Sequence, residues 1–151
     1  MRARRFLPGV MAAALLAGLP PASADRSPQT NYLLRCAGCH GMSGAGAPNA
    51  GIPDFRGKVG SLAMTQDGRL YLMHVPGVVG SQLSHREIAE VTNYLMQRWG
   101  GDSAGAGYQA FTEAEVRRLR EENVADVVVL RRDVVRELEV LGLPVATYPW
   151  P

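Results

Sequence analysis

The sequence predicts an all-α protein, and three features support that fold class. Two segments begin with a capping box, in which the first side chain and the residue three positions later bond to each other's backbone: Ser84 with Glu87, and Thr112 with Glu115. Apolar residues follow each box at helical spacing. A stretch rich in glycine and proline, residues 41–60, predicts a long loop before these helices.

The first expected helix runs from about Pro28 towards Cys36. Pro28 is compatible with this helix because a proline in the first turn removes no intrahelical hydrogen bond. Tyr32 precedes Cys36 by four residues, so the two share one helical face. Tyr32 is therefore expected to pack inside the domain.

The middle of the chain gives weaker signals. Asp67-Gly68 looks like a turn. Residues 69–74 form either a short helix or an extended segment, and the Pro-Gly pair within residues 75–78 breaks that element. The next helix is expected from about His85 to Arg98, closed by a pair of glycines.

Residues 101–111 are expected to be a linker, flexible over its Gly/Ala/Ser-rich part, 101–107. Residues 112–151 are expected to be a helical extension to about Leu141, broken near Asn123, with an irregular tail. Its apolar stripes consist of Val116 and Leu119 before the break, and Val124, Val127, Val128, Val134, Val135, Leu138 and Leu141 after it.

Charge separates this extension from the rest of the chain. Residues 25–100 carry seven basic and five acidic side chains, a net charge of +2, whereas residues 101–151 carry six basic and nine acidic ones, a net charge of −3. Two interpretations are open: a solvated appendage packed on the preceding domain, or a docking arm for a partner protein.

Residues 1–24 have the pattern of a secretory signal peptide. Three arginines precede an apolar run at 6–19, and Ala22-Ser23-Ala24 is an A-x-A cleavage site. The run is shorter than the ~20 residues of a membrane span. Cleavage is therefore expected to leave Asp25 as the N-terminus of an exported, periplasmic protein, and an uncleaved membrane anchor is the alternative.

Removal of this peptide changes the charge of the chain. The precursor has 16 basic and 14 acidic residues, and the signal holds three of the basic ones, so 13 basic and 14 acidic residues remain. This near-neutral balance gives no sign of nucleic-acid binding. No later segment is long and apolar enough to span a membrane.

The central motif of the chain is Cys36-Ala37-Gly38-Cys39-His40. C-x-x-C-H is the attachment signature of a c-type haem: two thiols add to the porphyrin vinyl groups, and the histidine gives an imidazole nitrogen to the iron. A thioredoxin-like pair would need a βαβ context. A zinc site would need four ligands, and His74 and His85 do not complete a familiar spacing.

The short helix leading into C-x-x-C-H, the Gly/Pro loop and the capped helix with Tyr94 near its end together resemble the small monohaem cytochrome c fold over residues 27–99. The resemblance implies a haem domain at 25–100, one haem c per chain on Cys36 and Cys39, and His40 as proximal iron ligand. It also implies contact between the first and last helices of that domain, through Tyr32 and Tyr94.

The sequence departs from that family where the second iron ligand is expected. Family members usually have a methionine directly before a proline ahead of the last helix, and Val75-Pro76 stands there. Met73 is a tentative distal ligand and His74 is an alternative. A third possibility is an open position, while Met64 is a weaker candidate and Met42 lies too close to the proximal side.

The resemblance implies electron transfer by the haem, as a periplasmic carrier or the cytochrome subunit of a redox complex, with a dehydrogenase or oxidase as partner. The chain would then be an electron carrier and not itself an enzyme. The alternative is a haem protein with an open sixth position that binds a small ligand or has peroxidase-like activity. A hydrogen bond from the second ring nitrogen of His40 to a loop carbonyl near Pro53 is also expected.

Overall fold

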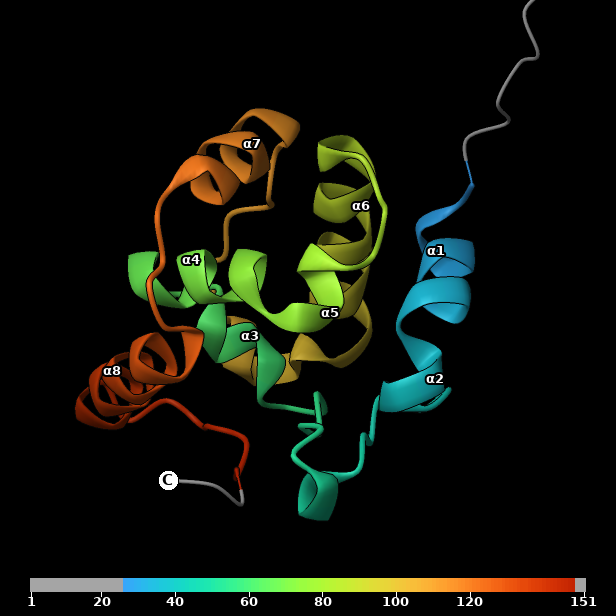
Figure 1. The fold of residues 1–151 in the computed structure, drawn as a ribbon. Helices are drawn as coiled ribbons and strands as arrows, with labels where there is room; N and C mark the ends of the chain where they lie inside the picture. Colours follow the sequence, from blue (N-terminus) through green and yellow to red (C-terminus); the bar gives the residue numbers. More distant parts are fainter. Residues whose placement is uncertain (1–25, 149–151) are drawn as a thin grey trace, which may run out of the picture.

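Helix α1 (Pro28–Arg35) is the first element of the described part of the chain, residues 26–148 of a computed structural model (Figure 1). Its start follows from Ser27, whose side chain accepts a hydrogen bond from the Thr30 amide, and from Pro28 in the first turn. A single turn of helix, α2 (Ala37–His40), follows directly. The helix predicted to lead into the C-x-x-C-H motif is confirmed.

The predicted loop contains little regular structure until its end. A 3-10 turn, η1 (Pro48–Ala50), interrupts it, and the short helix α3 (Val59–Leu62) closes it. The sequence pattern did not predict α3, which lacks a side-chain cap.

Helix α4 (Gln66–His74) corrects the expectation of a turn at Asp67-Gly68, since both residues lie in its first turn. The Thr65 hydroxyl caps the helix by accepting a hydrogen bond from the Gly68 amide at 3.0 Å. The segment for which helix and strand were both open is therefore helical. Val75 has an extended backbone and separates α4 from another short helix, α5 (Pro76–Val79).

Helix α6 (His85–Leu95) has the predicted capping box, with both bonds between Ser84 and Glu87 present. It continues as a π-helical turn, η2 (Met96–Gly100), and stops at Gly101, whose φ is +52°. The predicted helix to Arg98 is thus confirmed in extent, although its last turn is π-helical. Helix α1 packs against α6 (Figure 1).

Only the first residues of the predicted linker, 101–111, form a helix, while residues 105–111 contain a turn and no regular helix. Residues Gly101–Ala104 form the 3-10 helix η3, which packs on α3. Buried Ser103 accepts a hydrogen bond from the Gly60 amide at 3.0 Å and donates one to the Gly100 carbonyl at 2.5 Å. A Cβ on Gly60 would lie 2.3 Å from the Ala104 nitrogen, so this close approach requires glycine.

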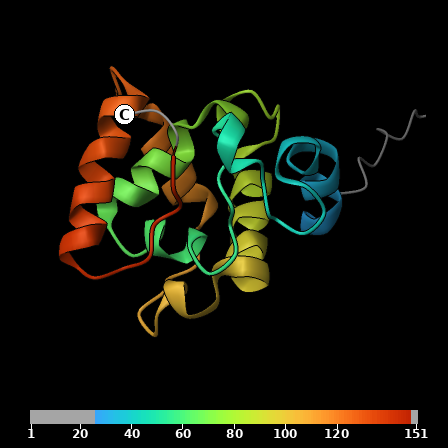
Figure 2. The ribbon, with the colours of Figure 1, turned by 90° about the horizontal axis from the view of Figure 1, so that it is seen from below.

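The extension forms two helices, as the break near Asn123 predicted: α7 (Glu113–Glu121) and α8 (Val127–Val140). Helix α7 packs on α4 and α6, and α8 packs on α4 and α3. Figures 1 and 2 show both helices on the flank of the molecule opposite α1 and α2. The interpretation of the extension as a packed appendage therefore agrees with the structure.

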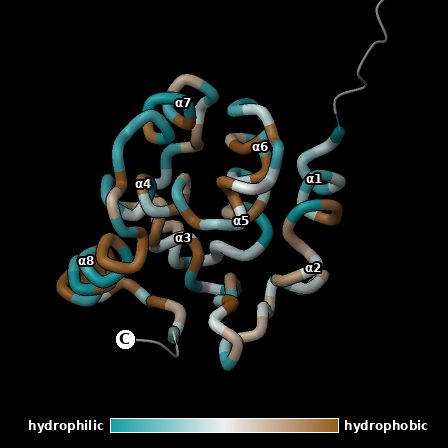
Figure 3. Tube along the Cα trace, in the orientation of Figure 1, coloured by the Kyte–Doolittle hydropathy of each residue, from teal (hydrophilic) through white to brown (hydrophobic). Residues whose placement is uncertain are grey.

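The core contacts of the extension come from only part of the predicted stripes. Val116, Leu119, Val134 and Leu138 are fully buried, whereas Val128 and Leu141 are exposed. In Figure 3, hydrophilic and hydrophobic residues alternate along α7 and α8, as in amphipathic helices. Within residues 26–148, no helix is long and apolar enough to cross a membrane. The predicted signal peptide and the last residues of the predicted tail, 149–151, lie outside the described residues.

Candidate haem-attachment site

Cys36, Cys39 and His40 are held together by one turn of backbone. The Cys36 amide continues α1 by donating to the Tyr32 carbonyl, and the Cys36 carbonyl accepts from the amides of Cys39 and His40 at 3.2 and 3.0 Å. Both thiols are free; Cys36 is half-buried and Cys39 is exposed. Burial raises the pKa of the Cys36 thiol, and the neighbouring Cys39 adds to this effect.

The imidazole of His40 is oriented by the loop that follows it. Its Nδ1 lies 3.3 Å from the Pro53 carbonyl oxygen, the contact expected from the sequence. The ring also stacks on Phe55, with centroids 4.0 Å apart. Burial lowers the pKa of His40, and the hydrogen bond to Pro53 opposes that shift. A neutral ring that donates through Nδ1 leaves the Nε2 lone pair available to a metal.

A cluster of aromatic side chains packs next to this turn: Tyr32, Phe55, Tyr94 and Trp99. Tyr32 lies 6.0 Å from Tyr94 between ring centroids, the predicted contact between the first and last helices of the haem domain. The Tyr32 hydroxyl donates to the Gly41 carbonyl at 2.5 Å, and burial raises the pKa of Tyr32 to about 12. The cluster thus fixes the end of the C-x-x-C-H turn to α6.

Trp99 is the centre of this cluster, a role that the sequence interpretation missed. Its ring lies 4.8 Å from Tyr32, 6.0 Å from Tyr94 and 6.2 Å from Phe55. A Cβ on Gly44 would lie 2.8 Å from the indole, so the loop passes close to Trp99 only because residue 44 is glycine. The position of Trp99 one turn after Leu95 was the available signal.

The two candidate distal ligands have other contacts. His74 places Nδ1 3.0 Å from the Leu70 carbonyl oxygen and Nε2 3.1 Å from the Glu122 carbonyl oxygen, between α7 and α8. Met73 is 1% exposed and belongs to the core cluster. The structure thus brings together Cys36, Cys39 and His40, and it places His74 against the extension.

The residues present fit a covalently bound haem. Two unpaired thiols lie on one helical turn, and an imidazole with its outer nitrogen held by a carbonyl follows at once. This donor set is the one that thioether attachment and axial ligation require. Within residues 26–148, no group of three or more His, Cys, Asp or Glu side chains forms an alternative metal site.

Comparison with known proteins settles the family. A cytochrome c-552 from one strain of Thermus thermophilus is 33% identical, and the alignment covers 89% of this chain and 97% of that protein. A second cytochrome c-552 from Thermus thermophilus is 32% identical, with 72% of this chain and 92% of that protein aligned. No family model matches the chain.

The chain belongs to the small c-type cytochromes.

The alignment with the first of these relatives extends into the helical extension. Residues 1–100 are about two thirds of the 151-residue chain, so an alignment that covers 89% of it must continue into residues 101–151. The related cytochrome therefore shares at least part of the segment that forms η3, α7 and α8.

Arg69 is the main polar contact between the cytochrome domain and this extension. Its guanidinium donates to both carboxylate oxygens of Glu115 at 2.6 Å and to the carbonyls of Ala63 and Gln109 at 3.2 and 3.0 Å. It also lies 3.7 Å from the centroid of the Phe111 ring. Glu115 therefore pairs with Arg69, whereas the sequence predicted that it would complete a capping box.

This ion pair predicts an acid-sensitive stability. The hydrogen bonds from Arg69 are the largest cause that lowers the pKa of Glu115 below its ordinary value of 4.5. A lowered folded-state pKa stabilises the protein above pH 4.5, and this stabilisation is lost as pH falls through the folded-state value. Urea titrations at pH 7 and pH 3 should show a larger loss of stability in the wild type than in Glu115→Gln. Equal losses in the two proteins would contradict the assignment.

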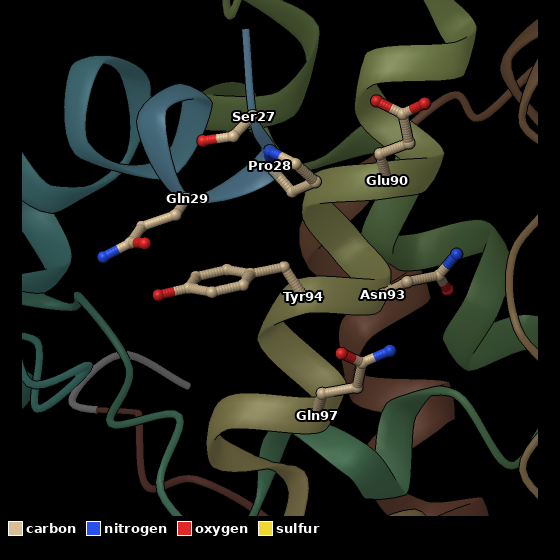
Figure 4. Close-up of a pocket in the computed structure, with 7 residues that line it drawn as sticks. All are labelled: Ser27, Pro28, Gln29, Glu90, Asn93, Tyr94 and Gln97. Atoms are coloured by element: carbon tan, nitrogen blue, oxygen red, sulfur yellow. The ribbon is translucent and has the colours of Figure 1, made fainter.

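A groove lies between α1 and α6 (Figure 4). It is lined by Ser27, Pro28, Gln29, Glu90, Asn93, Tyr94 and Gln97. Asn93 is already engaged with the extension: its side chain donates to the Phe111 carbonyl and accepts from the Phe111 amide and the Tyr108 hydroxyl. The groove contains no cysteine or histidine, and we assign it no ligand.

Proposed function

We propose that this cytochrome is a periplasmic electron carrier with one haem c per chain, attached through Cys36 and Cys39 and ligated by His40. The observation that best supports this proposal is the geometry of the C-x-x-C-H turn. It holds two free thiols next to the His40 imidazole, whose Nδ1 lies 3.3 Å from the Pro53 carbonyl oxygen. When bound, the haem supplies a reversible one-electron couple. The residues of the chain provide attachment, orientation and shielding.

Each of these roles has an identified residue. The Pro53 carbonyl sets the tautomer and plane of His40, and the stacked Phe55 ring restricts rotation of the imidazole. Tyr32 and Trp99 are themselves buried, and the Tyr32 hydroxyl holds the end of the turn by donating to the Gly41 carbonyl. Burial and hydrogen bonding at an iron ligand are two of the means by which a protein sets a reduction potential.

The N-terminal sequence pattern supports the periplasmic part of the proposal. The N-terminal pattern of a signal peptide and the attachment motif are independent features, and haem attachment to such a motif takes place outside the bacterial cytoplasm. Removal after Ala24 would leave the cytochrome free in the periplasm. An uncleaved N-terminal segment would instead hold it at the membrane.

The proposed partners are redox proteins such as a dehydrogenase or an oxidase. Of the basic residues that could steer such a partner, Arg69 is excluded because it is buried and paired with Glu115. Arg56 and Lys58 have solvent-exposed side chains, and both pair with Asp54: Arg56 Nε lies 2.9 Å from Oδ1, and Lys58 Nζ lies 3.6 Å from Oδ2. The same haem would serve either a free carrier or a subunit of a redox complex. In a complex, α8 would be available for contact with another subunit.

The proposal is tested by potentiometric titration of the purified, haem-loaded protein. The haem spectrum should convert completely between the oxidised and reduced forms and return without loss. A protein that is not reversibly reduced would exclude the role of electron carrier.

A further inference from the structure

We infer that the outward face of α8 is a contact surface for a second copy of this chain, and that the two α8 helices pack antiparallel about a twofold axis. The contact consists of four residues of α8: Val129, Asp133, Arg136 and Val140. These four residues are called the α8 seam below. The inference goes beyond the proposed function, because it concerns the assembly of the protein and does not depend on the haem.

The α8 seam lies on the side of the helix that points away from the rest of the chain. Val134 and Leu138 are fully buried and face the domain. Arg136 is two residues from each of them, or about 160° around the helix, so it faces the opposite way. Figures 1 and 2 show α8 at the outer flank of the molecule, with no other described segment beyond it. A second copy therefore has free access to this face.

The C-terminal tail does not cover the α8 seam. The Arg131 guanidinium donates to the Ala146 carbonyl at 3.0 Å and lies 4.3 Å from the centroid of the Tyr148 ring. Arg131 is about 140° around the helix from Arg136. The part of the tail that the structure describes, up to residue 148, is therefore held on another side of α8.

The exposed apolar side chains of α8 lie at its two ends. Val128 and Val129 are 39% and 47% exposed at the start, and Val140 and Leu141 are 88% and 56% exposed at the end. The exposed residues between them are all charged: Arg132, Asp133, Arg136, Glu137 and Glu139. Single exposed apolar residues are common on protein surfaces, but here they bracket a charged centre on one helix.

This pattern is complementary to itself in the antiparallel orientation. The α8 seam residues are four, three and four positions apart, which is the spacing of the contact positions in a coiled coil. In an antiparallel pair centred between residues 134 and 135, Val129 faces Val140 of the second copy, and Asp133 faces Arg136 of the second copy. Twofold symmetry repeats each pair, so apolar contacts at both ends enclose two ion pairs.

Other arrangements of the same face are unfavourable. In a parallel pair each residue would face its own copy, which would place Asp133 against Asp133 and Arg136 against Arg136. A slip of one helical turn would place a valine opposite a charged side chain, which would lose hydration without gaining a partner. The match of both charge and apolarity in one register therefore favours a second copy as the occupant of this face.

The expected contact is weak. Within one chain Arg136 already donates to Asp133, but both side chains are exposed, at 71% and 47%, and such pairs contribute little to stability. Helix α8 has 14 residues, fewer than the ~20–30 residues that each partner contributes to a stable interface. We expect a dissociation constant on the order of 100 µM. Because α8 is on the flank opposite α2, the dimer leaves both C-x-x-C-H turns accessible (Figure 1).

The test is sedimentation equilibrium of the purified, haem-loaded protein from about 10 µM to about 1 mM, a range that brackets the expected dissociation constant. The wild type should show a monomer–dimer equilibrium. Asp133→Arg and Arg136→Asp should each weaken it at least about tenfold, because two attractive pairs become repulsive. An equimolar mixture of the two variants should restore dimers, since every pair across the contact is then Arg with Asp.

Arg117→Asp is the matched control, because it reverses the charge of an exposed arginine on α7, outside the α8 seam. It should leave the dissociation constant within about twofold of the wild type. A wild type that stays monomeric up to the highest concentration would overturn the inference. A dimer that neither single variant weakens would show that the contact lies elsewhere. A mixture no more dimeric than its components would overturn the antiparallel register.

Discussion

Replacing Cys36 and Cys39 together by serine is expected to abolish covalent haem attachment. The two thiols are the only ones in the chain, and hydroxyl groups do not form the thioether bonds that hold haem c. The variant should show no haem staining after denaturing electrophoresis, whereas the wild type should stain. It should also fold poorly, because the macrocycle supplies apolar core to a small domain.

Met42→Ser is the matched control for the cysteine variant. Met42 is two residues from His40 and is exposed, so its replacement changes a neighbouring sulfur that the account does not use. This variant should retain full haem staining. Covalent haem in the double cysteine variant would contradict the attachment site.

Arg69→Ala is expected to be the most destabilising single polar substitution in the chain. Removing one partner of a buried ion pair costs about 3–5 kcal/mol, because the other charge is left without compensation. Here the carbonyls of Ala63 and Gln109 also lose a donor, and the Phe111 ring loses its cation. The melting temperature should fall by at least about 10 °C, while the haem spectrum stays that of the wild type.

Two further variants test whether the loss of stability in Arg69→Ala comes from its buried contacts or from the loss of any arginine. Arg117→Ala removes an exposed i,i+4 pair with Glu113 and should cost less than about 0.5 kcal/mol. Arg69→Lys should restore little stability, because an ammonium group cannot reproduce the bidentate bond and both carbonyl contacts. An Arg69→Ala protein that melts with the wild type would show that the extension is held by apolar packing alone.

The sequence predicted the site more completely than the fold around it. The C-x-x-C-H motif, the capping box at Ser84 and the break before α8 are local signals, and each corresponds to a local structure. Asp67-Gly68 was wrongly predicted as a turn because the cap at Thr65, two residues earlier, outweighs the turn preference of that pair. Residues this close to a cap adopt the conformation of the helix it begins.

The contacts between distant segments could not be predicted in this way. Gly101–Ala104, at the start of the predicted linker, form η3 against α3, and this packing is possible because Gly60 has no side chain where Ala104 approaches. Trp99 and Arg69 are likewise defined by partners far along the chain, Tyr32 and Glu115. Spacing within a segment carries no information about such partners, so the residues through which the extension contacts the domain are seen only in the structure.

The central claim is that this cytochrome carries electrons on a haem held by Cys36, Cys39 and His40. The most direct measurement is a spectroelectrochemical titration of the purified protein, followed through the haem absorption bands in both directions. The account predicts a single, fully reversible one-electron transition that involves all of the covalently bound haem. An irreversible transition, or a covalent haem that does not change oxidation state, would contradict it.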